Sequence, residues 1–218
     1  MIETRHNFKS GAELAKGLAQ DVAEWLKDAI TERGFAVLAV SGGTTPKPFF
    51  VALSHHKLEW KNVQITLVDE RQVDETSPRS NAKLVKEALV QNEAAVAQFI
   101  PLYQNPNASN LSRFDVAILG MGNDGHTASF FPSGDNLAAA LDLEQAHSII
   151  TMNATGAGEP RLTFTLPRLL TARKLCLHIQ GADKMAVLEK ALSGDDQTEM
   201  PVRAVIHSPK PLNLYWCP

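Results

Sequence analysis

Apolar residues occur along this chain in short, largely uninterrupted runs that alternate with stretches of helical periodicity. The clearest runs lie at positions 35–40, 63–68, 114–119 and 175–179. Runs of this length are typical of strands covered on both faces, as in a parallel sheet. The pattern therefore predicts buried strands at these four positions, and weaker runs at 100–103, 147–152, 162–166 and 212–216 predict further strands.

The segment before the first run predicts a long amphipathic helix. Ser10 followed by Glu13 has the spacing of a capping box, apolar residues recur every three or four positions from Leu14 to Ile30, and Gly34 is a typical stop. Shorter helices are expected near 46–53, 81–91, 182–192 and in the tail after Met200. Strands that alternate with helices along the whole length predict a single α/β domain over residues 1–218, with a mostly parallel sheet packed in three layers.

The composition argues against several classes of protein, including membrane-spanning and nucleic-acid-binding proteins. The chain has 218 residues, of which 44% are hydrophobic, and no apolar run is long enough to cross a bilayer. The N-terminus lacks the apolar core of a signal peptide, so we expect a cytoplasmic protein. A net charge of −3 without a basic block argues against a nucleic-acid partner. Cys176 and Cys217 lie in apolar contexts without metal-ligand spacing, which predicts buried thiols and no disulfide.

A small anionic ligand remains compatible with this charge, because such a site needs only a few local cations and backbone N–H groups. The first strand leads into Ser41, Gly42, Gly43, Thr44 and Thr45, followed by a helix. A glycine-rich turn between a strand and a helix directs free N–H groups and the helix N-terminus at an anion, and phosphate is the natural candidate. The alternative interpretation is a plain strand-to-helix turn, because neither common nucleotide-binding glycine motif is present.

Charged residues follow two other predicted strands. Asp69, Glu70 and Arg71 come directly after the second strand, where ligands of open α/β sheets bind. Lys184 lies in the first turn of a predicted helix, where a cation opposes the helix dipole unless an anion is bound nearby. We expect both groups to line the pocket; the alternative is that these side chains are simply solvated.

The third strand runs into the polar turn at 120–132, which contains three glycines within six residues. Glycine lets the backbone approach a ligand closely, and Asp124 and His126 supply a titratable pair beside it. If the turn keeps the extended geometry of the strand, side chains two positions apart share one face. The pattern predicts a catalytic turn in which Asp124 and His126 act together.

Taken together, these motifs resemble the 6-phosphogluconolactonase family, part of the superfamily that also contains glucosamine-6-phosphate deaminase. The resemblance covers nearly the whole chain and rests on SGGTTP at 41–46, VDER at 68–71, SN at 80–81, GMGNDGHTAS at 120–129, RLT at 161–163 and GADK at 181–184. It implies a Rossmann-like α/β fold, a phosphorylated sugar lactone as substrate, and neither metal nor cofactor. The implied reaction is hydrolysis of 6-phosphoglucono-1,5-lactone, a step of the oxidative pentose phosphate pathway.

Two residues separate the branches of this superfamily. The deaminases carry a glutamate where this chain has Phe131, and they tend to carry tyrosine where it has Arg71. The deaminase glutamate assists the histidine in ring opening, and a phenyl ring cannot transfer a proton. The resemblance therefore favours the lactonase branch, although FFPSG at 130–134 departs from the LFPG often found there.

The resemblance, together with the chemistry of ester hydrolysis, assigns expected roles. His126 is the expected general base, since imidazoles titrate near working pH, and Asp124 would fix its tautomer and orientation. The substrate phosphate would lie on Ser41, Gly42, Gly43 and Thr44, with Arg161 and Lys184 as cationic partners. Arg71 or backbone N–H groups would hold the oxyanion; Asp69 matches the proton acceptor of the deaminases, and its role here is open. No acyl-enzyme motif is present, which favours direct attack by water.

Two alternatives stay open at this stage. One is a sugar-phosphate isomerase or deaminase of the same fold, and the other is a sugar-phosphate sensor that binds without turnover. We expect a monomer or a weak homodimer whose partner is a small molecule.

Overall fold

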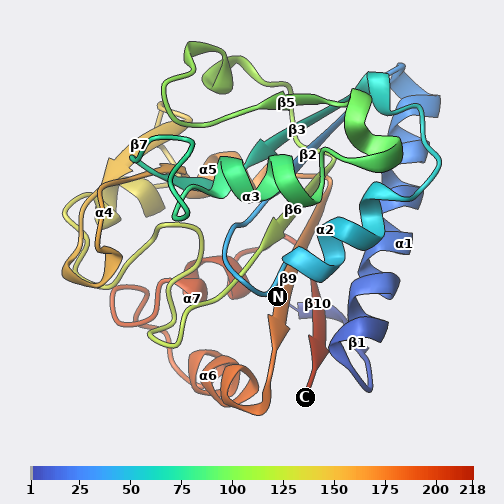
Figure 1. Ribbon diagram of the computed structural model, residues 1–218. Helices are drawn as coiled ribbons and strands as arrows, with labels where there is room; N and C mark the ends of the chain where they lie inside the picture. Colours follow the sequence, from blue (N-terminus) through green and yellow to red (C-terminus); the bar gives the residue numbers. More distant parts are fainter. Residues whose placement is uncertain (1) are drawn as a thin grey trace.

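The computed structural model describes residues 2–218, and its centre is a seven-stranded sheet (Figure 1). The strand order is β1-β10-β9-β6-β2-β3-β5, and every neighbouring pair is parallel. The α/β fold with a mostly parallel sheet is thus confirmed. The strands of this sheet are β1 (Ile2–Asn7), β2 (Ala36–Val40), β3 (Val63–Leu67), β5 (Gln98–Ile100), β6 (Val116–Leu119), β9 (Lys174–Gln180) and β10 (Leu212–Cys217).

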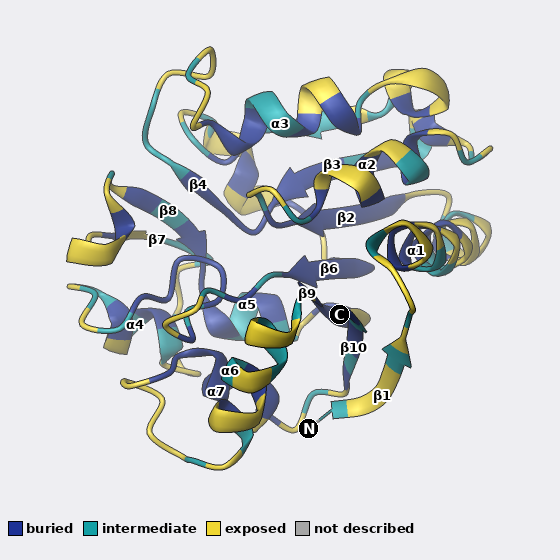
Figure 2. Cartoon of the chain, turned by 60° about the horizontal axis from the view of Figure 1, so that its bottom comes forward, coloured by how far each residue is buried: buried dark blue, intermediate teal, exposed yellow. Residues whose placement is uncertain are grey.

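Helices cover both faces of the sheet, which gives the three expected layers (Figure 2). The first group consists of α1 (Gly11–Arg33), α2 (Lys47–Ser54) and α3 (Asn81–Ala88), which pack on one another in sequence. The second group consists of α4 (Leu137–Leu141), α5 (Leu166–Leu170), α6 (Ala182–Leu192) and α7 (Val202–Ile206). Because both faces are covered, strands such as β2 and β6 are buried at every position, as their continuous apolar runs predicted.

The ends of α1 follow directly from the sequence. Ser10 accepts a hydrogen bond from the backbone N–H of Glu13, and Gly34 closes the helix in the left-handed conformation with φ 81°. Leu14, Leu18 and Leu26 are almost completely buried against the sheet. The predicted helix is therefore confirmed with both of its caps.

The order of the strands creates a switch point between β2 and β6. From β2 the chain proceeds to β3 and β5 on one side, whereas from β6 it proceeds to β9 and β10 on the other. Adjacent strands whose connections diverge leave a crevice beyond their carboxyl ends, and ligands of open α/β sheets bind there. The glycine turns after Val40 and Leu119 both lie at this edge.

A second, three-stranded sheet corrects the sequence prediction. It contains β4 (Asp69–Arg71), β8 (Arg161–Phe164) and β7 (Ile149–Met152), paired antiparallel in that order. We expected the strands near 147–152 and 162–166 to belong to the parallel sheet. Apolar periodicity reports burial but not the direction of the partner strand, so it could not distinguish the two sheets.

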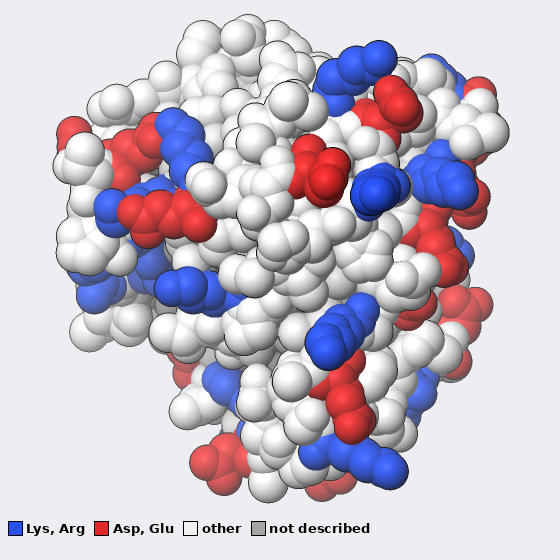
Figure 3. Space-filling view, turned by 45° about the vertical axis from the view of Figure 1, so that its right-hand side comes forward, with Lys and Arg blue, Asp and Glu red and all other residues white. Residues whose placement is uncertain are grey.

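On the face shown in Figure 3, acidic and basic side chains are interspersed. Within residues 2–218, none of the helices is both long and apolar enough to cross a membrane. Cys176 and Cys217 are buried free thiols, as expected, and burial raises the pKa of both.

Candidate active site

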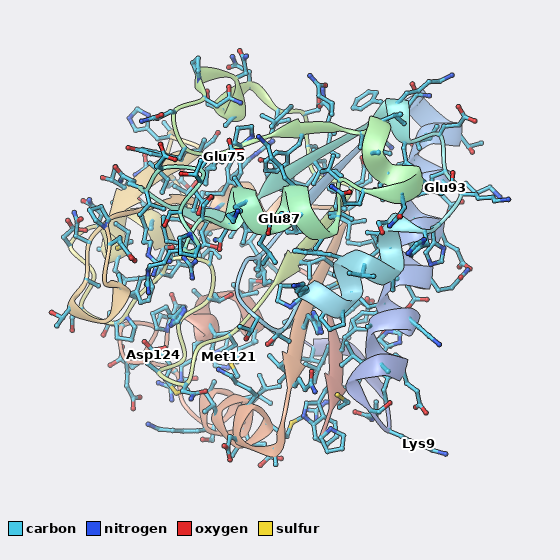
Figure 4. All side chains as sticks on the ribbon, viewed as in Figure 1. Lys9, Glu75, Glu87, Glu93, Met121 and Asp124 are labelled. Carbon is cyan, nitrogen blue, oxygen red and sulfur yellow. The ribbon has the colours of Figure 1, made fainter. Side chains whose placement is uncertain are left out.

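A cavity of about 350 Å³ lies at the switch point, beyond the carboxyl ends of β2, β6 and β9. All but one of the predicted site residues line it: Ser41, Gly42, Gly43, Thr44, Asp69, Arg71, His126, Arg161 and Lys184. Asp124 is the exception, and it contacts the cavity through His126. Figure 4 shows Asp124 and Met121 in the turn that follows β6, beside α6. Segments far apart in the sequence are thus assembled around one space.

Ser41 joins the two strands at the switch point. Its hydroxyl donates a hydrogen bond to the carbonyl oxygen of Ile118 at 2.9 Å and accepts one from the backbone N–H of Gly120 at 3.0 Å. A hydroxyl has a single hydrogen to donate, so Ser41 would have to release Ile118 to donate to a phosphate. Its observed contacts hold the two glycine turns together.

The backbone after Ser41 is better placed to receive an anion. The N–H groups of Gly42, Gly43 and Thr44 donate no hydrogen bond to any residue between 2 and 218, and α2 begins after Pro46 without a side-chain cap. Free N–H groups and the start of a helix attract negative charge. The Gly42–Thr44 segment, called the anion turn below, is the part of the predicted phosphate site that has donors available.

Asp124 and His126 form a close pair. Nδ1 of His126 lies 2.6 Å from Oδ1 of Asp124, and the backbone N–H of His126 donates to the same oxygen at 3.2 Å. They do not meet through an extended backbone, as we had supposed. The turn is tight, with Gly125 at φ 78° and a hydrogen bond from the Gly122 N–H to the His126 carbonyl oxygen.

The carboxylate sets the tautomer of the imidazole. Burial by itself would raise the pKa of Asp124, but the hydrogen bond from His126 and its charge outweigh burial and lower that pKa. Asp124 is therefore ionised at neutral pH and can only accept, so Nδ1 carries the hydrogen. The other ring nitrogen, Nε2, is left without a hydrogen in the neutral ring, as a general base requires.

Phe131 contacts both His126 and a cation. Its ring centroid is 4.4 Å from that of His126, and the Arg161 guanidinium lies over the same ring at 5.4 Å. Phe131 is 3% exposed and lines the cavity. An apolar ring, which cannot transfer a proton, thus lies beside the histidine.

The small antiparallel sheet places two arginines side by side. Arg71 on β4 is the register partner of Arg161 on β8. Burial, and then the positive charge of Arg71, lower the pKa of Arg161. Like charges opposite one another in a sheet are unfavourable, and Nε of Arg71 is buried without a hydrogen-bond partner in the described chain. Two close guanidinium groups with an unpaired N–H are the features expected of an anion site.

Loops on either side hold these arginines. Arg71 donates to the carbonyl oxygen of Arg79, and Arg161 donates to the carbonyl oxygens of Ala157 and Glu159. An ion pair between the side chains of Arg79 and Glu159 connects the two loops.

The remaining charged residues have distinct partners. Nζ of Lys184 donates to the carbonyl oxygen of Met121 at 2.8 Å, and burial lowers the pKa of Lys184 despite the nearby charge of Asp124. Asp69 accepts a hydrogen bond from the Ser129 hydroxyl at 2.6 Å. Glu70 is 2% exposed and accepts from the backbone N–H groups of Asn81 and Ala82, so it caps α3 and does not line the cavity.

Sequence reasoning missed three polar residues that line the cavity: Asn81, His178 and Gln180. Asn81 lies in the quoted SN motif and packs against Gly42, where a Cβ would be only 1.9 Å from Oδ1 of Asn81. His178 and Gln180 fall within and at the end of a predicted strand, where alternation alone does not tell a site residue from a core residue. In the part of the chain described, no three His, Cys, Asp or Glu side chains cluster as metal ligands would.

The chain is similar to known proteins over nearly its whole length. Residues 9–216 match the family model described as glucosamine-6-phosphate isomerases/6-phosphogluconolactonase. A 6-phosphogluconolactonase from Rhizobium meliloti is 47% identical over the full length of both chains, and one from Pseudomonas putida is 40% identical over 98% of this chain and 92% of its own.

Solved structures agree. A 6-phosphogluconolactonase from Shewanella baltica superposes over the whole of both chains with a TM-score of 0.95 and 37% identity. A monomeric glucosamine-6-phosphate deaminase covers 98% of this chain and 97% of its own at a TM-score of 0.77; with 18% identity it shows a shared fold only. The chain belongs to the glucosamine-6-phosphate isomerase/6-phosphogluconolactonase family.

Proposed function

We propose that this chain hydrolyses 6-phospho-D-glucono-1,5-lactone to 6-phospho-D-gluconate, with His126 activating the attacking water. The observation that carries the proposal is the pair formed by Asp124 and His126 beside Phe131, facing a cavity that also holds Arg71, Arg161 and Lys184. The base, its orienting carboxylate and cations for a phosphorylated substrate lie around one space. The close full-length relatives that carry the name 6-phosphogluconolactonase support the same reaction.

The proposed chemistry is addition of water to the lactone carbonyl followed by elimination of the ring oxygen, without an acyl-enzyme intermediate. Nε2 of His126 takes a proton from water as the oxygen adds to C1 of the lactone, which forms a tetrahedral oxyanion. Collapse of this intermediate breaks the bond between C1 and the ring oxygen, and the proton held on His126 passes to that oxygen. Asp124 stabilises the imidazolium between the two steps. Arg71, whose guanidinium lines the cavity, is a candidate to stabilise the oxyanion.

The phosphate would lie on the anion turn, with Arg161 and Lys184 as cationic partners. Asp69 lines the cavity but is held by Ser129, so we assign it a positioning role. Phe131 argues against a deaminase, because it offers no proton beside His126.

The test is a lactonase assay corrected for spontaneous hydrolysis. We expect His126→Ala to lower turnover at least a hundredfold, roughly the range for loss of a general base. Turnover near the wild-type rate would remove the assignment. Ammonia release from glucosamine 6-phosphate would identify a deaminase instead, and binding without turnover would identify a sensor.

A comparison of substrates tests the phosphate site. We expect kcat/KM for 6-phosphogluconolactone to exceed that for unphosphorylated gluconolactone, because only the first engages the anion turn, Arg161 and Lys184 through a phosphate. Equal values would contradict the phosphate assignment. Activity that survives exhaustive chelation would support the expected independence from metal, whereas restoration by added metal would contradict it. The cytoplasmic location and the monomer or weak homodimer stay predictions.

A further inference from the structure

His178 is a buried imidazole in the wall of the cavity, and it has no role in the proposed mechanism. It lies on β9 and is 5% exposed. Side chains alternate along a strand, so His178 shares one face of β9 with Cys176 and Gln180. Of these three residues, His178 and Gln180 line the cavity and Cys176 does not.

The ring of His178 has no polar partner among the residues that the structure describes. Between residues 2 and 218, neither of its nitrogens makes a hydrogen bond, and its recorded ring contact is an edge-to-face one with Phe49 at 6.1 Å. Within residues 2–218 the fully enclosed side-chain atoms without a hydrogen-bond partner are Nε of Arg71 and Nε of Arg168, so the ring nitrogens of His178 keep access to the cavity that this residue lines. An imidazole at the cavity wall without a partner in the described chain is available to a polar group that enters the cavity.

Phe49 shows which part of the cavity the imidazole faces. It lies in the first turn of α2, the helix that begins directly after the anion turn. Through Phe49 the ring of His178 contacts the first turn of the helix that follows the predicted phosphate position. His178 and the anion turn line the same cavity.

The protonation state of His178 fits a hydrogen-bond donor. Burial lowers its pKa to about 4, so the ring is neutral at neutral pH. A neutral imidazole keeps one N–H donor and one bare nitrogen. No carboxylate is hydrogen-bonded to its ring within residues 2–218, whereas Asp124 is hydrogen-bonded to His126.

We propose that His178 donates a hydrogen bond to the phosphate of the bound substrate and so forms the inner wall of the site begun by the anion turn. The proposal rests on the proposed function, because it takes a phosphorylated lactone as the ligand. His178 is then a specificity residue: it favours the phosphorylated substrate and takes no part in proton transfer at C1.

The test uses substitutions that separate the donor from the volume of the side chain. His178→Leu removes both ring nitrogens at similar size, and His178→Gln restores a donor. Cys176→Ala is the matched control, since Cys176 lies on the same face of the same strand, is buried and does not line the cavity. Each variant is measured for calorimetric binding of inorganic phosphate, for kcat/KM with both lactones, and for thermal unfolding.

We expect His178→Leu to weaken phosphate binding and to raise KM for the phosphorylated lactone about tenfold, as for one lost hydrogen bond to a charged group. Turnover of unphosphorylated gluconolactone should stay at the wild-type level, His178→Gln should recover part of the loss, and Cys176→Ala should bind phosphate as the wild type does. Unchanged phosphate binding in His178→Leu would overturn the proposal, and so would an equal loss with both lactones.

A second measurement needs no substitution. The ring-nitrogen NMR resonances of His178 in the wild-type protein should shift when inorganic phosphate saturates the site, and unchanged resonances would contradict the proposal. Phosphate binding is measured without turnover, so a wild-type protein that binds phosphate through His178 but hydrolyses no lactone would refute only the proposed function.

Discussion

At the scale of single residues, the proposed catalytic pair of Asp124 and His126 depends on the absence of a side chain at Gly122. A Cβ on Gly122 would lie 2.1 Å from Nδ1 of His126 and 2.5 Å from Oδ1 of Asp124. Neither distance is possible for real atoms, so any larger residue at 122 must displace the imidazole, the carboxylate or the turn. Gly122 does not adopt a positive φ, so glycine is required here for close approach to the side chains of Asp124 and His126.

We expect Gly122→Ala to lower kcat about a hundredfold, because small misplacements of a catalytic group have effects of this size. KM should change little, since the anion turn and the arginines are untouched. Gly156→Ala is the control: Gly156 also lines the cavity, but a Cβ there meets nothing within 4 Å. Steady-state kinetics on both variants decide the matter, and a normal kcat for Gly122→Ala would mean that the turn adjusts without moving the pair.

At the scale of elements, Glu70 anchors the start of α3 to the second sheet. Its carboxylate accepts hydrogen bonds from the backbone N–H groups of Arg71, Asn81 and Ala82, at 2.7, 2.9 and 2.7 Å. Burial raises the pKa of Glu70, although these hydrogen bonds oppose the increase. The same contacts hold Arg71 and Asn81, both of which line the cavity, in fixed positions.

We expect Glu70→Gln to lower the free energy of unfolding by about 2 kcal/mol, because the amide offers one acceptor oxygen and turns an NH₂ group toward N–H donors. Glu75→Gln, which alters an exposed carboxylate paired with Lys86, should cost less than about 0.5 kcal/mol. Urea unfolding measures both. A loss no larger for Glu70→Gln than for Glu75→Gln would show that the cap is dispensable.

The pH dependence of this stability has a defined sign. The folded state holds the Glu70 proton more tightly than the unfolded chain, in which glutamate titrates near 4.3. The contribution of Glu70 to stability should therefore fall as pH rises from about 4.3 through the raised pKa, and level off above it. The difference between wild type and Glu70→Gln should shrink over this window; a difference that grows with pH would contradict the raised pKa.

The same elements show what sequence could and could not provide. The caps of α1 and the strand before each glycine turn are local features, so the pattern of residues predicted them. The pairing of β4 with β8, which sets Arg71 beside Arg161, depends on contacts between distant segments that periodicity does not encode. β1 was missed for another reason: it is an edge strand with mostly exposed polar residues, and so lacks a buried pattern. His178 was missed because a polar residue inside a buried strand resembles a satisfied core histidine.

At the scale of the whole molecule, the two ends of the parallel strands differ in what they contribute. The cavity lies at the carboxyl ends of the strands. Asp115, which is 3% exposed, lies at the other end just before β6; it accepts from the backbone N–H of Val37 at 2.8 Å and pairs with Arg33 and Arg173. Those partners come from the end of α1, from β2 and from the residue before β9, so a single carboxylate connects four elements far from the catalytic pair.

This arrangement predicts that stability and activity can be lost separately. Asp115→Ala should lower the free energy of unfolding by about 3 kcal/mol, since it breaks a buried charge network, while kcat/KM of the folded protein stays near wild type. Asp28→Ala, at an exposed position of α1, is the control for stability and should change it by less than about 0.5 kcal/mol. Asp124→Asn should do the opposite of Asp115→Ala, lowering kcat with little effect on urea unfolding, because Asp124 is 45% exposed and its main partner is His126. If Asp115→Ala lowered kcat as much as Asp124→Asn does, the two ends would be coupled through β6, and the catalytic turn would depend on the packing of the whole sheet.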